Sequence, residues 1–142
     1  MPLDATRHLI LYDGLCAMCN GFVRFVVRLD AGDVFRFAPL QGAAGATVIT
    51  RQPTVNAGMN TVYVVRNYET PNPQILSRSD AALFVLQELG GFWKAMARAA
   101  SKLPLSLRDG IYNFVARNRY HLARKLDACP LAAPQDKHRF LP

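Results

Sequence analysis

The sequence has few cysteines, few acidic residues and no long apolar run, and each shortage excludes a class of protein. Three cysteines occur in 142 residues, an odd number, and two of them are separated by only two residues, so they do not form the disulfide framework of a small secreted protein. No uninterrupted apolar stretch approaches the roughly 18 residues of a membrane-spanning helix. Residues 1–8 contain no basic segment that leads into an apolar one, so we expect a cytoplasmic protein.

The composition is that of a folded protein with an uneven distribution of charge. Hydrophobic residues make up 51% of the chain and charged residues 19%, which excludes a disordered chain. The net charge is +7, but residues 1–91 carry seven charges of each sign, whereas residues 92–142 carry ten basic and three acidic residues. Any anionic partner would therefore meet the last third of the chain.

The order of the expected elements in residues 1–91 is that of an α/β fold. A run of apolar residues predicts a buried strand at 8–12. Apolar residues at helical spacing predict an amphipathic helix at 16–29, which Gly32 is expected to end. Residues that favour β-structure predict a second strand at 34–38. One helix between two strands predicts a parallel β-α-β unit with a right-handed crossover. Residues 40–58 support at most a short helix.

A β-β-α unit and a helical extension follow. We expect a strand at 61–65, a hairpin partner at 74–77, and a helix that Ser79 or Asp80 caps and that Gly90 and Gly91 end. Two more helices are expected at 92–103 and 106–126, with a break at Pro104, before a tail without periodicity. At this length we expect a single domain, with a core at 1–91 and an extension at 92–142.

The basic extension has two interpretations. It can bind nucleic acid or an anionic membrane, or it can be solvated surface. On a helical wheel, one apolar stripe consists of Leu107, Ile111, Phe114, Val115 and Leu122. Arg117 and Arg124 lie opposite this stripe and other arginines lie on its flank, so the positive charge is spread around the helix. We therefore favour the interpretation as solvated surface, and expect no nucleic-acid partner and only weak membrane contact. Five aromatic residues are expected to pack the extension onto the core: Phe92, Trp93, Tyr112, Phe114 and Tyr120.

The segment Tyr12-Asp13-Gly14-Leu15-Cys16-Ala17-Met18-Cys19 places a Cys-x-x-Cys between the first strand and the first helix. A helix N-terminus favours an anion, so a thiol there ionises more easily, and the thiolate is the nucleophile in thiol–disulfide exchange. Cys16 is expected at that end. The two intervening residues bring Cys19 back toward Cys16, so Cys19 is expected to resolve a mixed disulfide on Cys16. This chemistry requires no organic cofactor, and its partners are thiols and disulfides of proteins or small molecules.

A metal site is the alternative use of these thiols. Zinc prefers about four ligands, which Cys16, Cys19, Cys129 and one of the three histidines can supply in number; the histidines are His8, His121 and His138. No second tight pair of ligands exists, however, and a zinc knuckle normally lies on a turn between hairpin strands. Redox use is therefore the favoured hypothesis. Its main alternative is a non-catalytic module of the same fold that binds a protein or an anionic surface, and a structural metal site is the third.

Asp13 and Cys129 each have two interpretations. Asp13 can act as a base when Cys19 loses its proton, or it can cap the helix, with Cys16 then the third helical residue. A charged carboxylate at Asp13 would oppose the effect of the helix terminus on Cys16. Cys129, in the tail, can be a third redox thiol, a metal ligand or a small buried hydrophobe, of which we favour the last.

The motif of Asp13, Cys16 and Cys19, with Tyr12 and Gly14 in place, resembles the DCC family of predicted thiol-disulfide oxidoreductases, which are related to thioredoxin. Other segments that resemble the family are residues 37–41, 79–81, 89–91, Arg108-Asp109 with Tyr112, 116–120, and Cys129 with Arg139-Phe140-Leu141. The resemblance implies a thioredoxin-like fold and dithiol chemistry.

The chain departs from the wider thioredoxin pattern at one position. Thioredoxins carry a proline immediately before the third strand, beside the thiols, whereas Gly58-Met59-Asn60 stand there in this sequence. Pro53 lies too far upstream to fill that place. We therefore expect substrates to dock differently from those of thioredoxin.

Overall fold

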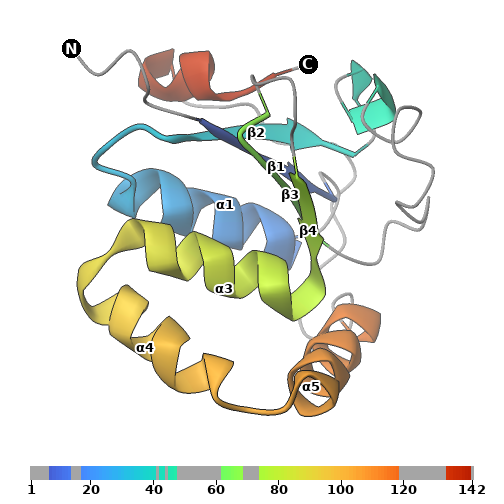
Figure 1. The fold of residues 1–142 in the computed structure, drawn as a ribbon. Helices are drawn as coiled ribbons and strands as arrows, with labels where there is room; N and C mark the ends of the chain where they lie inside the picture. The colour runs from blue at the N-terminus through green and yellow to red at the C-terminus, as the bar shows by residue number, and fades with distance from the viewer. Residues whose placement is uncertain are drawn as a thin grey trace.

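The central feature of the fold is a four-stranded mixed sheet in the order β2-β1-β3-β4 (Figure 1). It is seen in a computed structural model that describes residues 7–13, 17–40, 42–43, 45–47, 62–68, 74–118 and 134–141. The strands are β1 (His8–Tyr12), β2 (Phe35–Pro39), β3 (Tyr63–Arg66) and β4 (Gln74–Ser77). β1 pairs with β2 in parallel and with β3 antiparallel, and β3 pairs antiparallel with β4. The predicted β-α-β unit and hairpin are confirmed.

Both faces of the central strand are buried, as its continuous apolar run predicted. Successive residues point to opposite faces, so Ile10 and Tyr12 pack in one cluster with Phe37, whereas Leu9 and Leu11 pack in a second cluster. The first cluster lies between the sheet and two helices, α1 (Ala17–Leu29) and α3 (Arg78–Leu89), which cover that face (Figure 1). This arrangement is the thioredoxin-like α/β fold that the resemblance implied.

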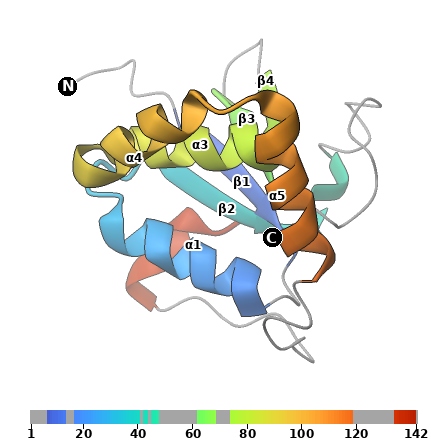
Figure 2. The same cartoon turned by 90° about the horizontal axis from the view of Figure 1, so that it is seen from below.

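The helical extension forms a further layer beneath α3, seen from below in Figure 2. It consists of α4 (Gly91–Ser101) and α5 (Leu105–Arg117). Trp93 of α4 packs edge-to-face on Phe25 of α1, with 4.9 Å between ring centroids. The break at Pro104 is confirmed, but α5 ends at Arg117, whereas the sequence predicted a helix to Leu126; residues 119–133 lie outside the described part of the chain.

The turn from α3 into α4 is made by two glycines in the left-handed region of backbone conformation. Gly90 has a φ angle of 74° and Gly91 one of 58°, and residues other than glycine rarely adopt such positive φ angles. This confirms the predicted end of the helix. The predicted start is wrong in detail, because α3 begins at Arg78, so Ser79 and Asp80 lie inside its first turn and their side chains bind α5 instead of capping the helix.

The tail contains a short helix that the sequence did not predict. Pro134–Arg139 forms the 3-10 helix η1. The chain then runs parallel to β2, as the bridge between Phe140 and Phe37 shows. Leu141 N–H donates to the Phe37 carbonyl at 2.8 Å, and the Phe140 ring stacks on the Phe37 ring. Leu141 also packs against the second core cluster. The tail thus lies along the free edge of β2. None of the helices in the described ranges combines the length and the apolarity needed to cross a membrane.

Candidate functional site

The predicted site lies at the carboxyl end of β1. Tyr12 pairs with Pro39 of β2, the Tyr12 carbonyl accepts a hydrogen bond from Leu40 N–H at 2.7 Å, and Asp13 follows as a buried residue, 3% exposed. Residues 14–16, and with them Cys16, lie outside the described residues. Because α1 begins at Ala17, the Cys-x-x-Cys spans the junction between a buried strand and the start of a helix, as the sequence predicted.

Cys19 lies in the first turn of α1. It is half-buried and packs against the core cluster between the sheet and α1. The helix is 13 residues long, has no acidic residue in its first turn and carries Arg28 in its last turn. Its N-terminal end therefore combines the positive end of the helix dipole with a first turn that holds no carboxylate, which is the environment that favours a thiolate.

Asp13 lies directly before the segment that carries the thiols. It is buried at the end of β1. Residues 14–16, between Asp13 and the first described residue of α1, lie outside the described part of the chain. Both hypotheses for Asp13, as a helix cap and as a base for Cys19, therefore stay predictions.

Helix α5 is fixed at the same end of the sheet. Because β3 runs antiparallel to β1, with Leu11 opposite Tyr63, Val62 lies beside the end of β1. Ser79 lies at the same end of the sheet, because Ser77 of β4 is opposite Tyr63. Val62 N–H donates to Tyr112 Oη at 2.9 Å. The extension thus reaches the segment that enters β3, next to the expected dithiol.

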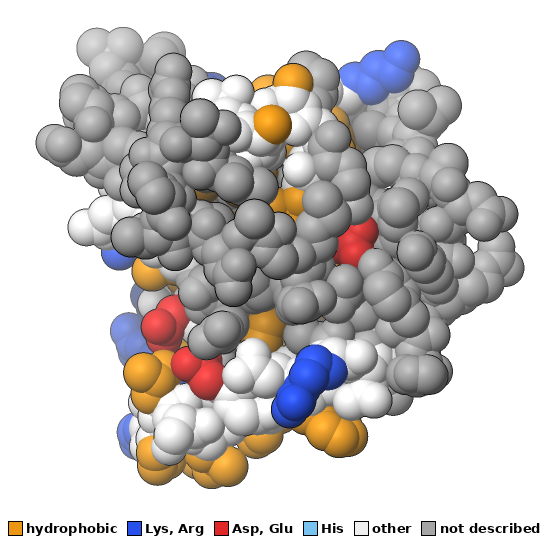
Figure 3. Space-filling view, turned by 90° about the vertical axis from the view of Figure 1, so that its right-hand side faces the viewer, with side chains coloured by type: hydrophobic (Ala, Val, Ile, Leu, Met, Phe, Trp, Pro, Cys, Tyr) orange, Lys and Arg blue, Asp and Glu red, His pale blue; other side chains and the backbone are white. Residues whose placement is uncertain are grey.

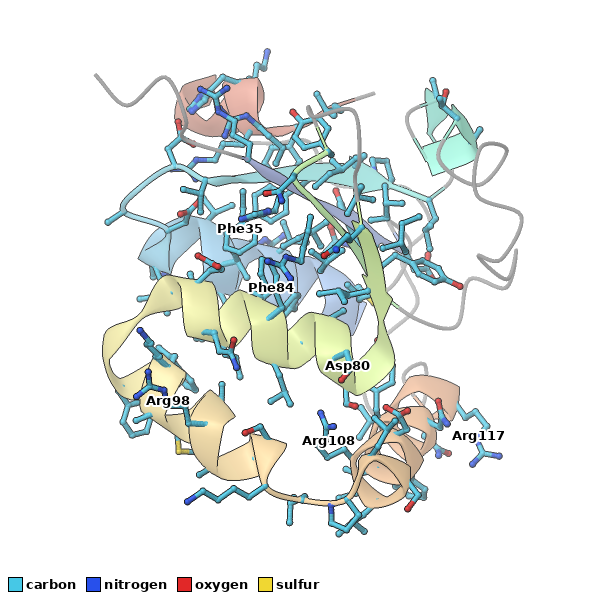
Figure 4. The ribbon with its side chains drawn as sticks, in the orientation of Figure 1. Phe35, Asp80, Phe84, Arg98, Arg108 and Arg117 are labelled. Carbon is cyan, nitrogen blue, oxygen red and sulfur yellow. The ribbon has the colours of Figure 1, made fainter. Side chains whose placement is uncertain are left out.

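Two further contacts join α5 to the start of α3. Ser79 Oγ donates to Asp109 Oδ1. Arg108 Nη1 lies 3.2 Å from Asp80 Oδ1, and Figure 4 labels both of these residues. Ser79 is buried, so its bond to a carboxylate stabilises the contact more than the exposed Asp80 pair does. The sequence did not predict these contacts, although Ser79-Asp80 and Arg108-Asp109 with Tyr112 are among the segments that resemble the family.

The end of β2 is closed by a tight helical turn. Gly45 is buried there, and a Cβ atom at this position would lie 2.8 Å from the carbonyl oxygens of both Pro39 and Leu40. The sequence allowed at most a short helix in this region, and residues 43 and 45–47 are helical. Residues 48–61, which include the positions before β3 where thioredoxins carry proline, lie outside the described residues.

The structure places two of the three candidate zinc-binding histidines away from the thiols. His8 begins β1, at the end opposite Asp13, and its Nδ1 accepts a hydrogen bond from Asn67 N–H at 3.1 Å. Burial lowers the pKa of His8, against the opposing effect of Glu88. His138 Nε2 lies 3.1 Å from Asp33 Oδ2. Asp33 belongs to the connection between α1 and β2, which lies at the same end of the sheet as His8. Neither can join Cys19 in a metal site.

The described residues contain no group of three His, Cys, Asp or Glu side chains able to hold a metal ion. His121, Cys129 and Cys16 lie outside the described residues, so the remaining ligands of the zinc hypothesis and the predicted burial of Cys129 stay predictions.

Comparisons with known proteins agree with the sequence motif. Residues 10–125 match the family model of DCC1-like thiol-disulfide oxidoreductases. The uncharacterized protein YuxK of Bacillus subtilis (strain 168) is 30% identical over 136 residues, which cover 96% of this chain and 95% of the relative. The chloroplastic DCC family protein At1g52590 of Arabidopsis thaliana is 31% identical over 125 residues, covering 88% of this chain and 70% of the relative. No solved structure matches.

Proposed function

The chain belongs to the DCC1-like thiol-disulfide oxidoreductase family, and we propose that it catalyses thiol–disulfide exchange with Cys16 as nucleophile and Cys19 as resolving thiol. The observation that supports this most is the place of Cys19, in the first turn of a helix that directly follows a buried central strand. The Cys-x-x-Cys spacing then puts Cys16 at the helix terminus, where a thiolate is favoured.

The proposed cycle moves two electrons and two protons. The Cys16 thiolate attacks one sulfur of a substrate disulfide, which breaks that S–S bond, forms a mixed disulfide and releases one substrate thiolate. Cys19, after losing its proton, attacks Cys16 Sγ, forms the Cys16–Cys19 disulfide and releases the second substrate thiolate. The substrate is reduced and the protein dithiol is oxidised. The reverse sequence oxidises a substrate dithiol.

Asp13 is the proposed acceptor of the Cys19 proton. Asp13 is buried at the end of β1 and lies three residues before Cys16 in the chain, and the attack by Cys19 requires a base nearby. Replacement of Asp13 by Asn keeps the shape and removes the basic oxygen. We expect Asp13→Asn to slow the resolving step while leaving the first attack by Cys16 nearly unchanged, which single-turnover kinetics with a chromogenic disulfide can separate.

The experiment that tests the proposal compares two serine variants. Cys19→Ser removes the resolving step and should accumulate long-lived mixed disulfides with a small disulfide such as oxidised glutathione, whereas Cys16→Ser should form few adducts, both detected by intact-mass spectrometry. Cys129→Ser is the matched control and should exchange like the wild type. Equal trapping by the two variants, or faster alkylation of Cys19 than of Cys16, would contradict the assignment of the nucleophile.

Metal binding is separated from redox use by a second measurement. Protein purified under reducing conditions should contain no stoichiometric zinc and should show a reversible two-electron transition that Cys16→Ser abolishes. One zinc per chain that is lost with Cys129→Ser would replace the redox proposal by the metal hypothesis. The proposal also keeps the cytoplasm as the expected location, and protein or small-molecule thiols as the expected partners.

A further inference from the structure

The exposed large hydrophobic residues of the described part of the chain are concentrated on the helical extension. All of them except Leu29 lie between residues 92 and 114: Phe92, Met96, Leu103, Leu105, Leu107, Ile111 and Phe114. We call these seven residues the apolar patch. Figure 3 shows hydrophobic side chains gathered along the lower edge of the molecule, where the extension lies. Monomeric proteins rarely expose a concentration of this kind unless it binds something.

Helix α5 presents its apolar stripe outward. Leu107, Ile111 and Phe114 recur at the spacing of one helical face, and Ile111 is 55% and Phe114 61% exposed. Polar residues occupy the inner face, where Asp109 and Tyr112 bind the start of α3 and the segment before β3. The prediction that Phe114 docks onto the core is therefore wrong, because polar side chains, not the stripe, make the contacts to the core.

Helix α4 continues the apolar patch. Trp93 and Ala97 face inward, whereas Phe92 and Met96, one turn apart, are 66% and 48% exposed. The prediction that Phe92 packs onto the core is thus also wrong. Leu103 and Leu105, in and after the connection at the lower edge of Figure 1, extend the patch from α4 to α5. Within α4 and from Leu103 to Phe114, each member is separated from the next by about one helical turn or less along the chain, and seven residues separate the two groups.

The exposed charges of α4 are of one sign. Residues 91–107 contain no acidic residue, and Lys94, Arg98 and Lys102 are all exposed there, at successive turns of α4 and its end. Asp109, the one acid of α4 and α5, is bound to Ser79. Arg117 is exposed at the end of α5, and Figure 4 shows it pointing away from the molecule.

From this combination we propose that the extension docks on the surface of an anionic lipid bilayer, with the apolar patch in the headgroup region and Lys94, Arg98 and Lys102 against lipid phosphates. Helices with an exposed apolar stripe and lysine or arginine beside it bind bilayers in this way. A second copy of the chain fits less well, because it would bring the same cations together in a protein whose net charge is already +7. Docking needs no transmembrane segment and does not depend on the redox proposal.

Sedimentation with lipid vesicles tests the inference on the full chain. One set of vesicles is phosphatidylcholine alone, and the other is an equal mixture of phosphatidylcholine and phosphatidylglycerol. We expect binding to the mixed vesicles that weakens as salt increases, and little binding to the neutral ones. Replacing Lys94, Arg98 and Lys102 together by Gln should lower the partition coefficient on the order of 100-fold, since each contributes roughly fivefold.

The matched charge control removes three exposed cations elsewhere. Arg24 and Arg28 on α1 and Lys137 on η1 are exposed, so their replacement by Gln changes the net charge equally but not the extension. We expect this control to bind nearly as well as the wild type. For the apolar part, Phe92→Ser with Ile111→Ser and Phe114→Ser should weaken binding by more than about tenfold, whereas Leu29→Ser on α1 should not. Retained thiol exchange and circular dichroism confirm that each variant is folded.

Three outcomes would overturn the inference. One is no binding to mixed vesicles at low salt, and another is equal loss with the charge control, which would mean general attraction of a basic protein. The third is a dimer in analytical ultracentrifugation that the Phe92, Ile111 and Phe114 variant dissociates, which would assign the patch to a second copy. None of the three bears on the Cys16 and Cys19 assignment, because the thiol assays contain no lipid.

Discussion

The ion pair between Arg139 and Asp30 holds the tail of the chain on the sheet and offers a direct test of how that tail is stabilised. Arg139 Nη1 lies 2.9 Å from Asp30 Oδ2 and 3.1 Å from Asp33 Oδ1. The Asp30 side chain is 3% and the Arg139 side chain 12% exposed, so this pair is largely removed from water. Replacement of Arg139 by Met keeps most of the side-chain volume and removes the charge.

The expected magnitude follows from the state in which Asp30 is left. Breaking a buried ion pair by removal of one partner typically costs about 3–5 kcal/mol. Asp30 retains hydrogen bonds from Val34 N–H at 3.2 Å and Phe35 N–H at 2.9 Å, which continue to stabilise its carboxylate. We therefore expect the lower end of this range, a loss of about 3 kcal/mol in the free energy of unfolding, or a fall of roughly 10 °C in Tm for a chain of this size.

The assay is denaturant unfolding of Arg139→Met beside a control from the same short helix. Lys137 is exposed, so Lys137→Met removes one positive charge without breaking a buried contact and should change the unfolding free energy by less than about 0.5 kcal/mol. If Arg139→Met is no more destabilised than Lys137→Met, the tail is not held by this ion pair. The Asp30→Asn variant, measured with the double variant, then gives the coupling energy of the pair.

Three further predictions concern single side chains in the sheet and around it. Gly45→Ala should destabilise the protein by about 1–3 kcal/mol in thermal unfolding, because the new Cβ meets two backbone oxygens, whereas Gly21→Ala, where nothing lies within 4 Å, should not destabilise it. Burial lowers the pKa of His8, so the unfolded state binds more protons and Tm should fall as the pH drops below about 6.5; His8→Gln should show a smaller fall. Tyr112→Phe removes the acceptor of Val62 N–H and should cost about 1 kcal/mol in unfolding free energy, and a loss of zero would mean that this bond does not hold α5.

The elements of the sheet could be predicted because their signals are local. The apolar run of β1 and the helical spacing of α1 each lie within one segment, and one helix between two strands restricts the pairing to a parallel, right-handed unit. The junction that carries the dithiol lies between these two elements, so its place was predictable too. The start of α3 was misjudged, because Ser79 and Asp80 are typical capping residues whose actual partners lie on α5.

The orientation of α5 could not be predicted from its helical wheel. A wheel identifies an apolar stripe but not the side that meets the core, and an inward apolar face is the usual case. Here the inner face is chosen by Tyr112 and Asp109, whose partners Val62 and Ser79 lie 50 and 30 residues away in the chain. No periodicity within the helix contains that information.

The tail escaped prediction for the same reason. A 3-10 helix of six residues is too short to produce a periodic pattern, and its contacts to Asp30 and Asp33 span more than 100 residues of sequence. Burial alone would raise the pKa of Asp33, yet Arg36, Arg139 and the hydrogen bond with His138 hold that pKa below its ordinary value. The carboxylate therefore stays charged in mild acid, and the tail keeps these ion pairs there.

Three of the segments that resemble the family outside the thiol motif have a common structural role. Ser79 binds Asp109, Tyr112 binds the backbone before β3, and Arg139 binds Asp30, so these contacts attach α5 and η1 to the rest of the protein. Dithiol exchange by itself requires only a strand, a helix terminus and two cysteines. The contacts of Ser79 and Tyr112 are therefore not needed for the exchange itself, and they attach α5 at the end of the sheet where the dithiol is expected.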